Sequence, residues 1–344
     1  MAGEVRIAVV GAGSIGRYHA HSVAFRIPEA ELVAVVDSVE DAARALAEAT
    51  NAGGWYVELD SVLGDPSVDA VVLASPGHTH AELIRRAASA GKHVFCEKPI
   101  GLDLTAIDDA LSEVDRTGVK LQLGFQRRFD RGYVRARQLL DEGVVGRTYM
   151  VHSRTRDPHL PPPEYLQICG GLFRDTMVHD FDSIRFLAGC EVRSVYAVGS
   201  VLVDPAVATT GDVDTAFVTM ELADGGLATI DNSRQAVYGY DVRAEVFGSE
   251  GALVVDQPNL TSTRRLGREG IVQDHVYWYL DRFAHAYEEE LRDFVRCVRM
   301  DSPTSVTGED GRAATVLALA AEESLCTGAP VRLSTASADK EAGL

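Results

Sequence analysis

The stretch VRIAVVGAGSIG, residues 5–16, decides the fold of the N-terminal part of the chain. Its first six residues form an apolar, β-branched run typical of a buried strand, and a helical pattern at 15–25 follows. Gly11, Gly13 and Gly16 match G-x-G-x-x-G, in which a tight turn lets the backbone approach a pyrophosphate at a helix N-terminus. The stretch therefore predicts a dinucleotide-binding turn. The alternative is a glycine-rich turn that serves packing alone.

The residue that ends the second strand pattern bears on the kind of dinucleotide. The run 31–36 is followed by Asp37, where the dinucleotide fingerprint has an acidic residue. A carboxylate there accepts hydrogen bonds from a ribose 2′-hydroxyl and repels a 2′-phosphate. Ser38 and Val39 provide no arginine that would compensate the repulsion. The sequence therefore favours NAD over NADP.

Alternation of strand and helix patterns extends this unit to residue 124. Strand patterns at 70–74, 94–96 and 121–124 alternate with helical patterns at 38–51, 80–90 and 104–117. Such alternation predicts an α/β domain with a doubly wound parallel sheet covered on both faces. We expect this Rossmann domain to span residues 1–124.

After Gly124 the pattern changes to longer strands that alternate apolar and polar residues. These strand patterns lie at 148–154, 192–203, 215–222, 226–232 and 242–247. Helical patterns lie at 133–140, 175–187, 283–299 and 312–323. The alternation predicts an antiparallel or mixed sheet with one covered face, in an α+β domain over residues 125–333. We expect a polar, frayed tail at 334–344.

Composition narrows the class of protein. A chain of 344 residues is long enough for two domains. Its net charge of −18 argues against sequence-independent binding to nucleic acid or to anionic membranes. No run approaches the ~18 apolar residues of a membrane helix, and the N-terminus does not resemble a signal peptide. The five cysteines form no C-x-x-C pair. We expect a cytoplasmic protein with reduced thiols and a small neutral substrate.

The turn after the strand pattern 70–74 holds a second group of candidates. Ligands of doubly wound sheets bind outside the carboxyl ends of the strands, so Ser75 and Pro76 are expected at the same crevice as the glycine turn. His78 and His80 form an H-x-H pattern, but no third histidine or carboxylate accompanies them, and no metal is predicted. For His80 we expect a helix-entry role or a cofactor contact.

Lys98 lies at the carboxyl end of the strand pattern 94–96, again at the crevice edge. An amine at this position can stabilise a developing alkoxide and contact the nicotinamide ribose. Pro99 restricts the conformation of Lys98, and the bond between them can be cis. The alternative is a solvated charge where a strand ends, and the residues alone leave both readings open.

The segment GGLFRDTMVHDFD, residues 170–182, is the second chemical candidate. On one predicted helix, Asp175, His179 and Asp182 share a face at i, i+4 and i+7. A carboxylate four residues from an imidazole can orient it and raise its basicity, which suits a proton acceptor. The alternative is Asp175 as a helix N-cap with His179 on the solvated face.

Together these stretches resemble the Gfo/Idh/MocA family of NAD(P)-dependent sugar and polyol oxidoreductases. The resemblance covers nearly the whole chain in the family order. It is carried by the glycine turn with His19, Ser75-Pro76 with His80, Glu97-Lys98-Pro99, GFQRRFD at 124–130, and 170–182. Glu-Lys-Pro is its most specific part. Within the family the chain is most similar to inositol 2-dehydrogenases, on 124–130, 175–182 and 233–241.

The resemblance implies a catalytic triad of Lys98, Asp175 and His179. His179, oriented by Asp175, would accept the hydroxyl proton as hydride leaves for NAD, and Lys98 would stabilise the alkoxide-like charge. The implied cofactor contacts are Gly11, Gly13, Ser14, Ile15, Gly16, Asp37, Ser75, Pro76, His80, Glu97 and Lys98. The implied substrate contacts are Gln126, Arg127, Asp157 and Tyr240, the last paired with Tyr238. The family also implies an open, mostly antiparallel second sheet whose free face pairs subunits into a homotetramer.

Departures from the family pattern leave the substrate open. Gln126 stands where some inositol dehydrogenases have methionine, residues 155–158 differ from a His-Arg-Asn-Pro-like stretch, and the loop before Asp175 is longer. The substrate can therefore be myo-inositol, scyllo-inositol or an aldopyranose. Two functions from other classes are an NAD-using glycosidase of the same family and a non-catalytic NAD- or sugar-binding regulator.

Overall fold

The computed structural model describes residues 3–333, so the predicted tail at 334–344 lies outside the described residues. The chain forms two compact units, the first from residues up to 129 and 285–315, the second from 130–284 and the segment after 315. The prediction was two continuous domains that meet at residue 124, with segment 285–315 in the second. In the structure this segment belongs to the first unit. An amphipathic helical pattern shows that a helix has a buried face but does not identify its packing partner.

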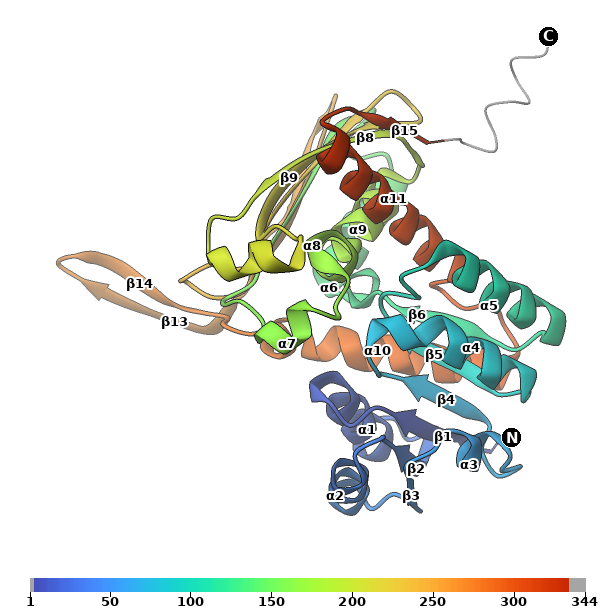
Figure 1. Cartoon of the computed structure of the whole chain (residues 1–344). Coiled ribbons are helices and arrows are strands. Elements are labelled where there is room, and N and C mark those ends of the chain that lie inside the picture. Colours follow the sequence, from blue (N-terminus) through green and yellow to red (C-terminus); the bar gives the residue numbers. More distant parts are fainter. Residues whose placement is uncertain (1–2, 334–344) are drawn as a thin grey trace, which may run out of the picture. The chain divides into compact units, whose positions relative to one another are not determined.

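The first unit is built on a six-stranded parallel sheet in the order β3-β2-β1-β4-β5-β6 (Figure 1). Its strands are β1 (Val5–Val10), β2 (Ala30–Val36), β3 (Trp55–Tyr56), β4 (Ala70–Leu73), β5 (His93–Glu97) and β6 (Leu121–Gly124). The strand order reverses between β1 and β4, which is the topological switch point of a doubly wound sheet. The predicted Rossmann architecture is confirmed, although the short β3 was not predicted.

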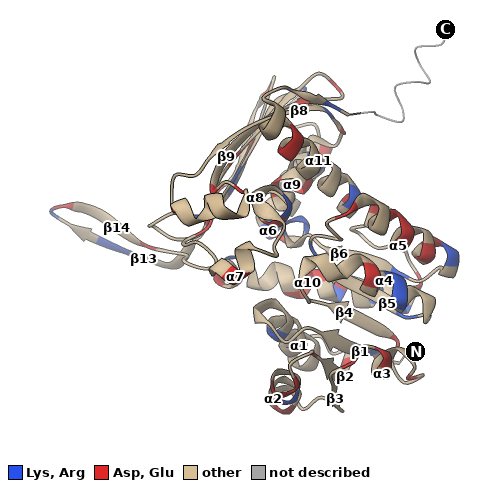
Figure 2. Ribbon diagram, in the orientation of Figure 1, with Lys and Arg blue, Asp and Glu red and all other residues tan. Residues whose placement is uncertain are grey.

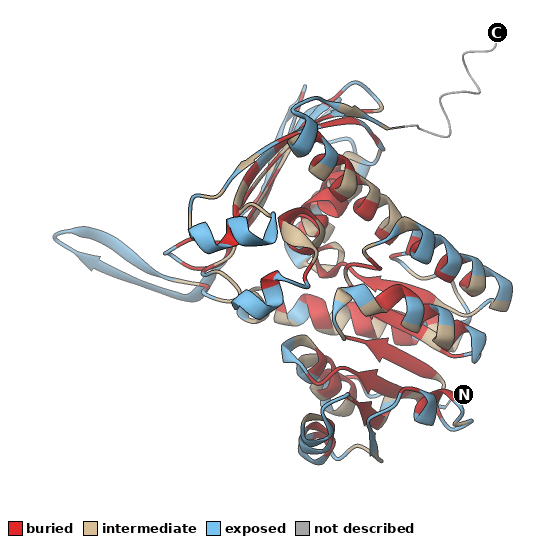
Figure 3. Cartoon of the chain, viewed as in Figure 1, coloured by how far each residue is buried: buried red, intermediate tan, exposed pale blue. Residues whose placement is uncertain are grey.

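Helices cover this sheet, and its central strands are almost entirely buried (Figure 3). The helices are α1 (Ser14–Arg26), α2 (Glu40–Thr50), α3 (Asp60–Leu63), α4 (His80–Ser89), α5 (Leu104–Thr117) and part of α10 (Tyr279–Met300). Helix α10 supplies Leu291, Phe294 and Val295 to the core around Ile7 and Phe95. Burial of these apolar side chains, at about 1.5–3 kcal/mol for each large one, explains why segment 285–315 belongs to the first unit.

The second unit contains a seven-stranded sheet in the order β12-β11-β7-β10-β9-β8-β15. Its strands are β7 (Thr148–Arg156), β8 (Val192–Ser200), β9 (Thr215–Leu222), β10 (Leu227–Ser233), β11 (Asp241–Gly248), β12 (Gly251–Val255) and β15 (Val331–Arg332). Only β7 and β10 pair in parallel; the other neighbours are antiparallel. Side chains of β9 alternate between buried and exposed, as one covered face requires. The open, mostly antiparallel sheet is confirmed.

The helices of this unit correct one prediction. They are α6 (Arg131–Asp141), α7 (Pro163–Leu166), α8 (Gly171–Asp175), α9 (Val178–Ala188) and the later part of α11 (Gly308–Thr327). The predicted single helix at 175–187 is wrong, because α8 ends at Asp175 and α9 begins at Val178. The N–H of Met177 donates to the carbonyl of Leu172 at 2.9 Å, which ends one helical ladder before the next begins. Asp175 is the last residue of α8 and Met177 is the N-cap of α9, so Asp175 is not a helix N-cap; Asp182 is buried.

A two-stranded hairpin, β13 (Asn259–Gly267) and β14 (Gly270–His275), was not predicted. Its residues are almost all exposed, and basic residues lie along β13 (Figure 2). Among the described residues, no helix is both long enough and apolar enough to span a membrane. All five cysteines are free.

Candidate active site

The glycine turn between β1 and α1 has the backbone that a dinucleotide requires. Gly11 has φ +105°, and a Cβ there would lie 2.5 Å from the carbonyl oxygen of Ala74. A Cβ on Gly16 would lie 1.9 Å from the oxygen of Gly11, so α1 packs closely on the strand end. Around Gly13, just before Ser14 and Ile15 open α1, a Cβ would meet nothing within 4 Å. This open cradle at a helix N-terminus fits a pyrophosphate.

Asp37 is held beside this turn. Its Oδ2 accepts a hydrogen bond from the N–H of Ala12 at 2.7 Å, and its Oδ1 accepts one from the N–H of Val39 at 2.8 Å. The carboxylate is thereby fixed against the glycine turn at the end of β2. Each oxygen keeps a second acceptor position, so the group can also receive ribose hydroxyls.

His80 joins the turns that follow β4 and β5. Its Nδ1 lies 2.7 Å from the carbonyl oxygen of Pro99, and its Nε2 lies 2.8 Å from that of Ser75. Burial lowers the pKa of His80, while the two contacts with carbonyl oxygens act in the opposite direction. His80 is the first residue of α4, which agrees with the expected role at the start of a helix. Because both ring nitrogens contact the backbone, the structure gives no support to a direct cofactor contact by this imidazole.

Lys98 follows β5 at the same edge of the sheet as the glycine turn. Its peptide bond to Pro99 is cis. Pro99 packs against the turn after β4, since a Cβ on Gly77 would lie 2.8 Å from the Pro99 Cδ. Within the first unit the structure thus brings together the glycine turn, Ser75 with Pro76, and Lys98, because β1, β4 and β5 are parallel neighbours.

The remaining candidates of the first unit are buried. Glu97 turns its carboxylate inward, with Oε1 2.7 Å from the Nε2 of His19. Gln126 and Arg127 begin the 3₁₀ segment Gln126–Phe129, and each is about 1% exposed. The amide Nε2 of Gln126 donates to the hydroxyl of Tyr287 at 3.2 Å.

In the second unit, two groups that the sequence reasoning missed hold Asp175. The hydroxyl of Tyr165 donates to its Oδ1 at 2.9 Å, and Nη1 of Arg234 donates to its Oδ2 at 3.2 Å. Arg234 is fully buried and also lies 3.7 Å from a carboxylate oxygen of Asp212. Burial alone would lower the pKa of Arg234, but the neighbouring carboxylates, first Asp175, raise it. Burial and the charge of Asp175 raise the pKa of Tyr165.

Asp157 and Tyr240 lie in the same unit. Asp157 directly follows β7, its N–H donates to the carbonyl of Ser233 at 3.0 Å, and its charge acts on Arg234. Tyr240 is buried, with its ring edge-on to Phe283 at 6.3 Å between centroids. The one signal for Arg234 in the sequence was its place inside the stretch 233–241 that carried the resemblance.

His179 stands in the first turn of α9, where its carbonyl accepts a hydrogen bond from the hydroxyl of Ser183 at 2.7 Å. The structure therefore places Asp175 and His179 on two successive helices of the second unit, and Lys98 in the first. The role of the three residues as a triad stays a prediction.

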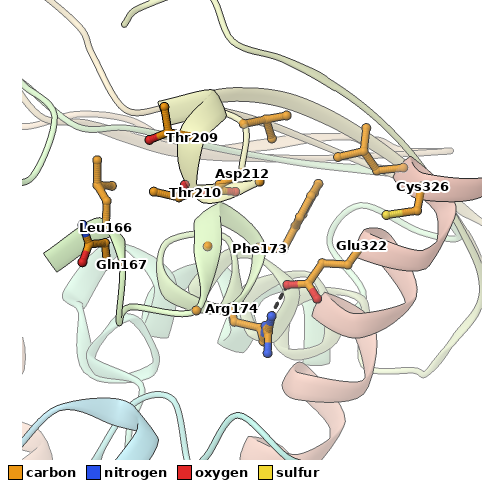
Figure 4. A pocket seen from close by; sticks show the side chains of 14 residues that line it. Leu166, Gln167, Phe173, Arg174, Thr209, Thr210, Asp212, Glu322 and Cys326 are labelled. Atoms are coloured by element: carbon orange, nitrogen blue, oxygen red, sulfur yellow. Dashed lines mark hydrogen bonds and ion pairs between the residues drawn. The ribbon is translucent and has the colours of Figure 1, made fainter. Parts of the chain in front are cut away.

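A pocket of about 510 Å³ in the second unit has a different lining (Figure 4). Across it, Nε of Arg174 donates to Glu322 at 2.7 Å. Asp212 accepts from the N–H of Leu172 at 3.0 Å. None of Asp157, Asp175, His179 and Tyr240 lines this pocket. It does not coincide with the predicted substrate contacts.

Comparison with known proteins covers nearly the whole chain. Residues 5–125 match the oxidoreductase family with an NAD-binding Rossmann fold, and residues 133–254 match the GFO/IDH/MocA C-terminal domain. The chain is 41% identical over 324 residues to the myo-inositol 2-dehydrogenase of Thermotoga maritima, which covers 93% of this chain and 96% of that enzyme. It is 37% identical over 330 residues to the scyllo-inositol 2-dehydrogenase (NAD(+)) of Bacillus subtilis, and the match covers 96% of this chain and 96% of that enzyme.

A solved structure shows the same fold. It is the scyllo-inositol dehydrogenase of Lactobacillus casei with bound NAD(H) and scyllo-inositol, with a TM-score of 0.91 and 32% identity over 96% of this chain and 99% of that one. The two family matches, the full-length relatives and the open glycine turn agree with one another. The chain belongs to the Gfo/Idh/MocA family of oxidoreductases, with an NAD-binding Rossmann fold.

Proposed function

We propose that this protein is an NAD-dependent dehydrogenase that oxidises a ring hydroxyl of a cyclic polyol, with myo-inositol, oxidised to 2-keto-inositol, as the favoured substrate. One observation carries the proposal: full-length similarity to inositol dehydrogenases in a chain whose glycine turn is open to a dinucleotide. Asp37, fixed against that turn, favours NAD over NADP.

The residues have the following roles in the proposed reaction. Bound NAD supplies the hydride acceptor. The imidazole of His179 accepts the proton of the reacting hydroxyl, and the carboxylate of Asp175 stabilises the resulting imidazolium. Tyr165 and Arg234 hold the two oxygens of Asp175, so that this carboxylate keeps one orientation. The amine of Lys98 stabilises the negative charge that develops on the substrate oxygen.

The assembly we propose is a homotetramer formed through the free face of the seven-stranded sheet. That face exposes large apolar side chains, among them Val198, Phe217 and Leu227, each more than 40% exposed. Exposed apolar patches of this kind mark protein contacts. A cytoplasmic location and a role in inositol catabolism are part of the same proposal and rest on the absence of a disulfide pattern among the five cysteines of the sequence and on the proposed reaction.

The test is a panel of inositols and aldoses with NAD and with NADP, followed by the absorbance of reduced nicotinamide. We expect turnover with NAD and an inositol. A glycosidase would release sugar from glycosides and form no net NADH from free inositol. Because the relatives act on both myo- and scyllo-inositol, the panel also decides the isomer. A Lys98→Ala variant that binds NAD and keeps normal turnover would contradict the role of Lys98.

A further inference from the structure

Three buried titratable side chains meet in the first unit, from α1, β5 and α10. They are His19, Glu97 and Glu290, exposed to 0%, 6% and 0%. Each offers a nitrogen or oxygen atom within 4.8 Å of the others. No other histidine, cysteine, aspartate or glutamate of the described residues belongs to this cluster, and the ring of Tyr287 packs edge-on to that of His19. The proposed mechanism uses none of the three, and only Glu97 was among the predicted site residues.

The two carboxylates of this cluster require a compensating positive charge. Among the described residues, neither Glu97 nor Glu290 forms an ion pair with a lysine or arginine, and both carboxylate oxygens of Glu290 lack a hydrogen-bond partner. Two anions side by side in a low-dielectric core, with no lysine or arginine beside them, are strongly destabilising. The cluster must therefore hold a cation, which can be a metal ion or a proton.

The distances favour a proton. Nε2 of His19 lies 2.7 Å from Oε1 of Glu97, which is a hydrogen-bond distance. Two ligand atoms of one ion, each about 2.1 Å from it at a right angle or wider, stand roughly 3 Å apart or more. His19 is thus a donor to Glu97. Burial, followed by the charge of Glu97, raises the pKa of Glu290 well above its usual value, which agrees with an acid that keeps its proton.

The cluster reaches Lys98 through Glu97. The second carboxylate oxygen, Oε2, lies 3.3 Å from the backbone nitrogen of Lys98, which donates to it. Gly124 at the end of β6 leaves room for this oxygen, since a Cβ there would lie 3.1 Å from it. One carboxylate therefore joins His19 of α1 to the backbone from which the Lys98 side chain extends.

We propose that His19, Glu97 and a protonated Glu290 are positioning residues, which together hold, through Glu97, the backbone of Lys98 in place. His19 donates its Nε2–H to Glu97, and Glu290 carries the buried acidic proton. The role of Lys98 in the reaction rests on the proposed function.

The first experiment is a double-mutant cycle on NADH binding, measured by titration of the full-length protein. Glu97→Gln replaces one carboxylate oxygen by an NH₂ group and breaks the contact with either His19 or Lys98. We expect it to weaken NADH binding about threefold to tenfold when Lys98 is present, as for the loss of one hydrogen bond, and by much less in a Lys98→Met background. Equal losses in both backgrounds would show that Glu97 does not act through Lys98, and would overturn the proposal.

The second experiment tests the proton itself and does not depend on activity. Glu290→Gln imitates the protonated acid, so we expect a melting temperature equal to or above that of the wild type at pH 8. We also expect purified wild-type protein to contain no stoichiometric metal by elemental analysis. A bound metal that is lost in Glu290→Gln, together with a lower melting temperature, would make this a metal site and overturn the proposal.

Different results would contradict the role of Lys98 in the reaction and the positioning role of Glu97. If Lys98→Met oxidises inositol at the wild-type rate, the proposed function of Lys98 fails. If Lys98→Met is inactive but Glu97→Gln binds NADH like the wild type, only the positioning role fails.

Discussion

Replacement of Arg234 by methionine tests the support of Asp175 most directly. The guanidinium is fully buried, 3.2 Å from Asp175 and 3.7 Å from Asp212, whose side chains are only 10% and 11% exposed. At an effective dielectric of about 20, charges at these separations attract by roughly 4–5 kcal/mol each, before the desolvation of the arginine is subtracted. Removing one partner of a buried ion pair typically costs about 3–5 kcal/mol. We expect Arg234→Met to lower the free energy of unfolding by that amount.

The assay is urea unfolding followed by circular dichroism, together with turnover. Without the guanidinium, the buried carboxylates of Asp175 and Asp212 lose the positive charge that lies beside them, which is the cause of the expected loss of stability. The control is Arg193→Met, because Arg193 is exposed and its guanidinium contacts the carbonyl of Ala223; we expect a change within about 0.5 kcal/mol. A loss below about 1 kcal/mol for Arg234→Met would refute the reasoning.

Three other perturbations address the cofactor, the buried proton and the assembly. Asp37→Ala should weaken NAD binding about tenfold and bring the dissociation constants of NAD and NADP closer together; an unchanged ratio in cofactor titrations would contradict the role of Asp37. Because the folded-state pKa of Glu290 is raised, the wild type should lose stability relative to Glu290→Gln as the pH rises above about 4.5, by about 1.4 kcal/mol per pH unit until the folded-state pKa is reached. Urea titrations check this slope, and a flat difference, like that expected for the partly exposed control Glu289→Gln, would be evidence against a buried proton. Phe217→Asp should dissociate the assembly in analytical ultracentrifugation without unfolding the chain, and an unchanged sedimentation coefficient would exclude this face as the interface.

Features that depend on neighbouring residues were predictable from the sequence. The strand 5–10, the glycine turn and the start of α1 follow from local hydrophobicity and from the φ +105° of Gly11, which glycine adopts readily. Helix α5 matches its predicted bounds because its ends carry their own signals. The carboxylate of Asp103 accepts from Ala106 N at the start, and Gly118 adopts φ +71° at the end.

The break between α8 and α9 was not predictable in the same way. Residues 171–188 carry one almost continuous helical pattern, and neither proline nor glycine marks residues 176–177. Residues near the break are held from outside the segment, as the bonds of Asp175 to Tyr165 and Arg234 illustrate. Helix propensity depends on each residue and its near neighbours in the sequence, so it does not reveal such contacts.

By itself, the sequence determined the dinucleotide-binding turn with its parallel strands and the class of the second sheet, because these depend on short-range patterns. The candidate catalytic residues followed from such patterns only together with the family resemblance. Only the tertiary structure decided what surrounds those residues. Asp175 meets Arg234 across 59 positions of sequence, and Glu97 meets His19 across 78. Glu290 joins them from α10, which packs on the N-terminal core. Such partners are chosen by burial and charge compensation in the folded chain, which no periodicity along the sequence records.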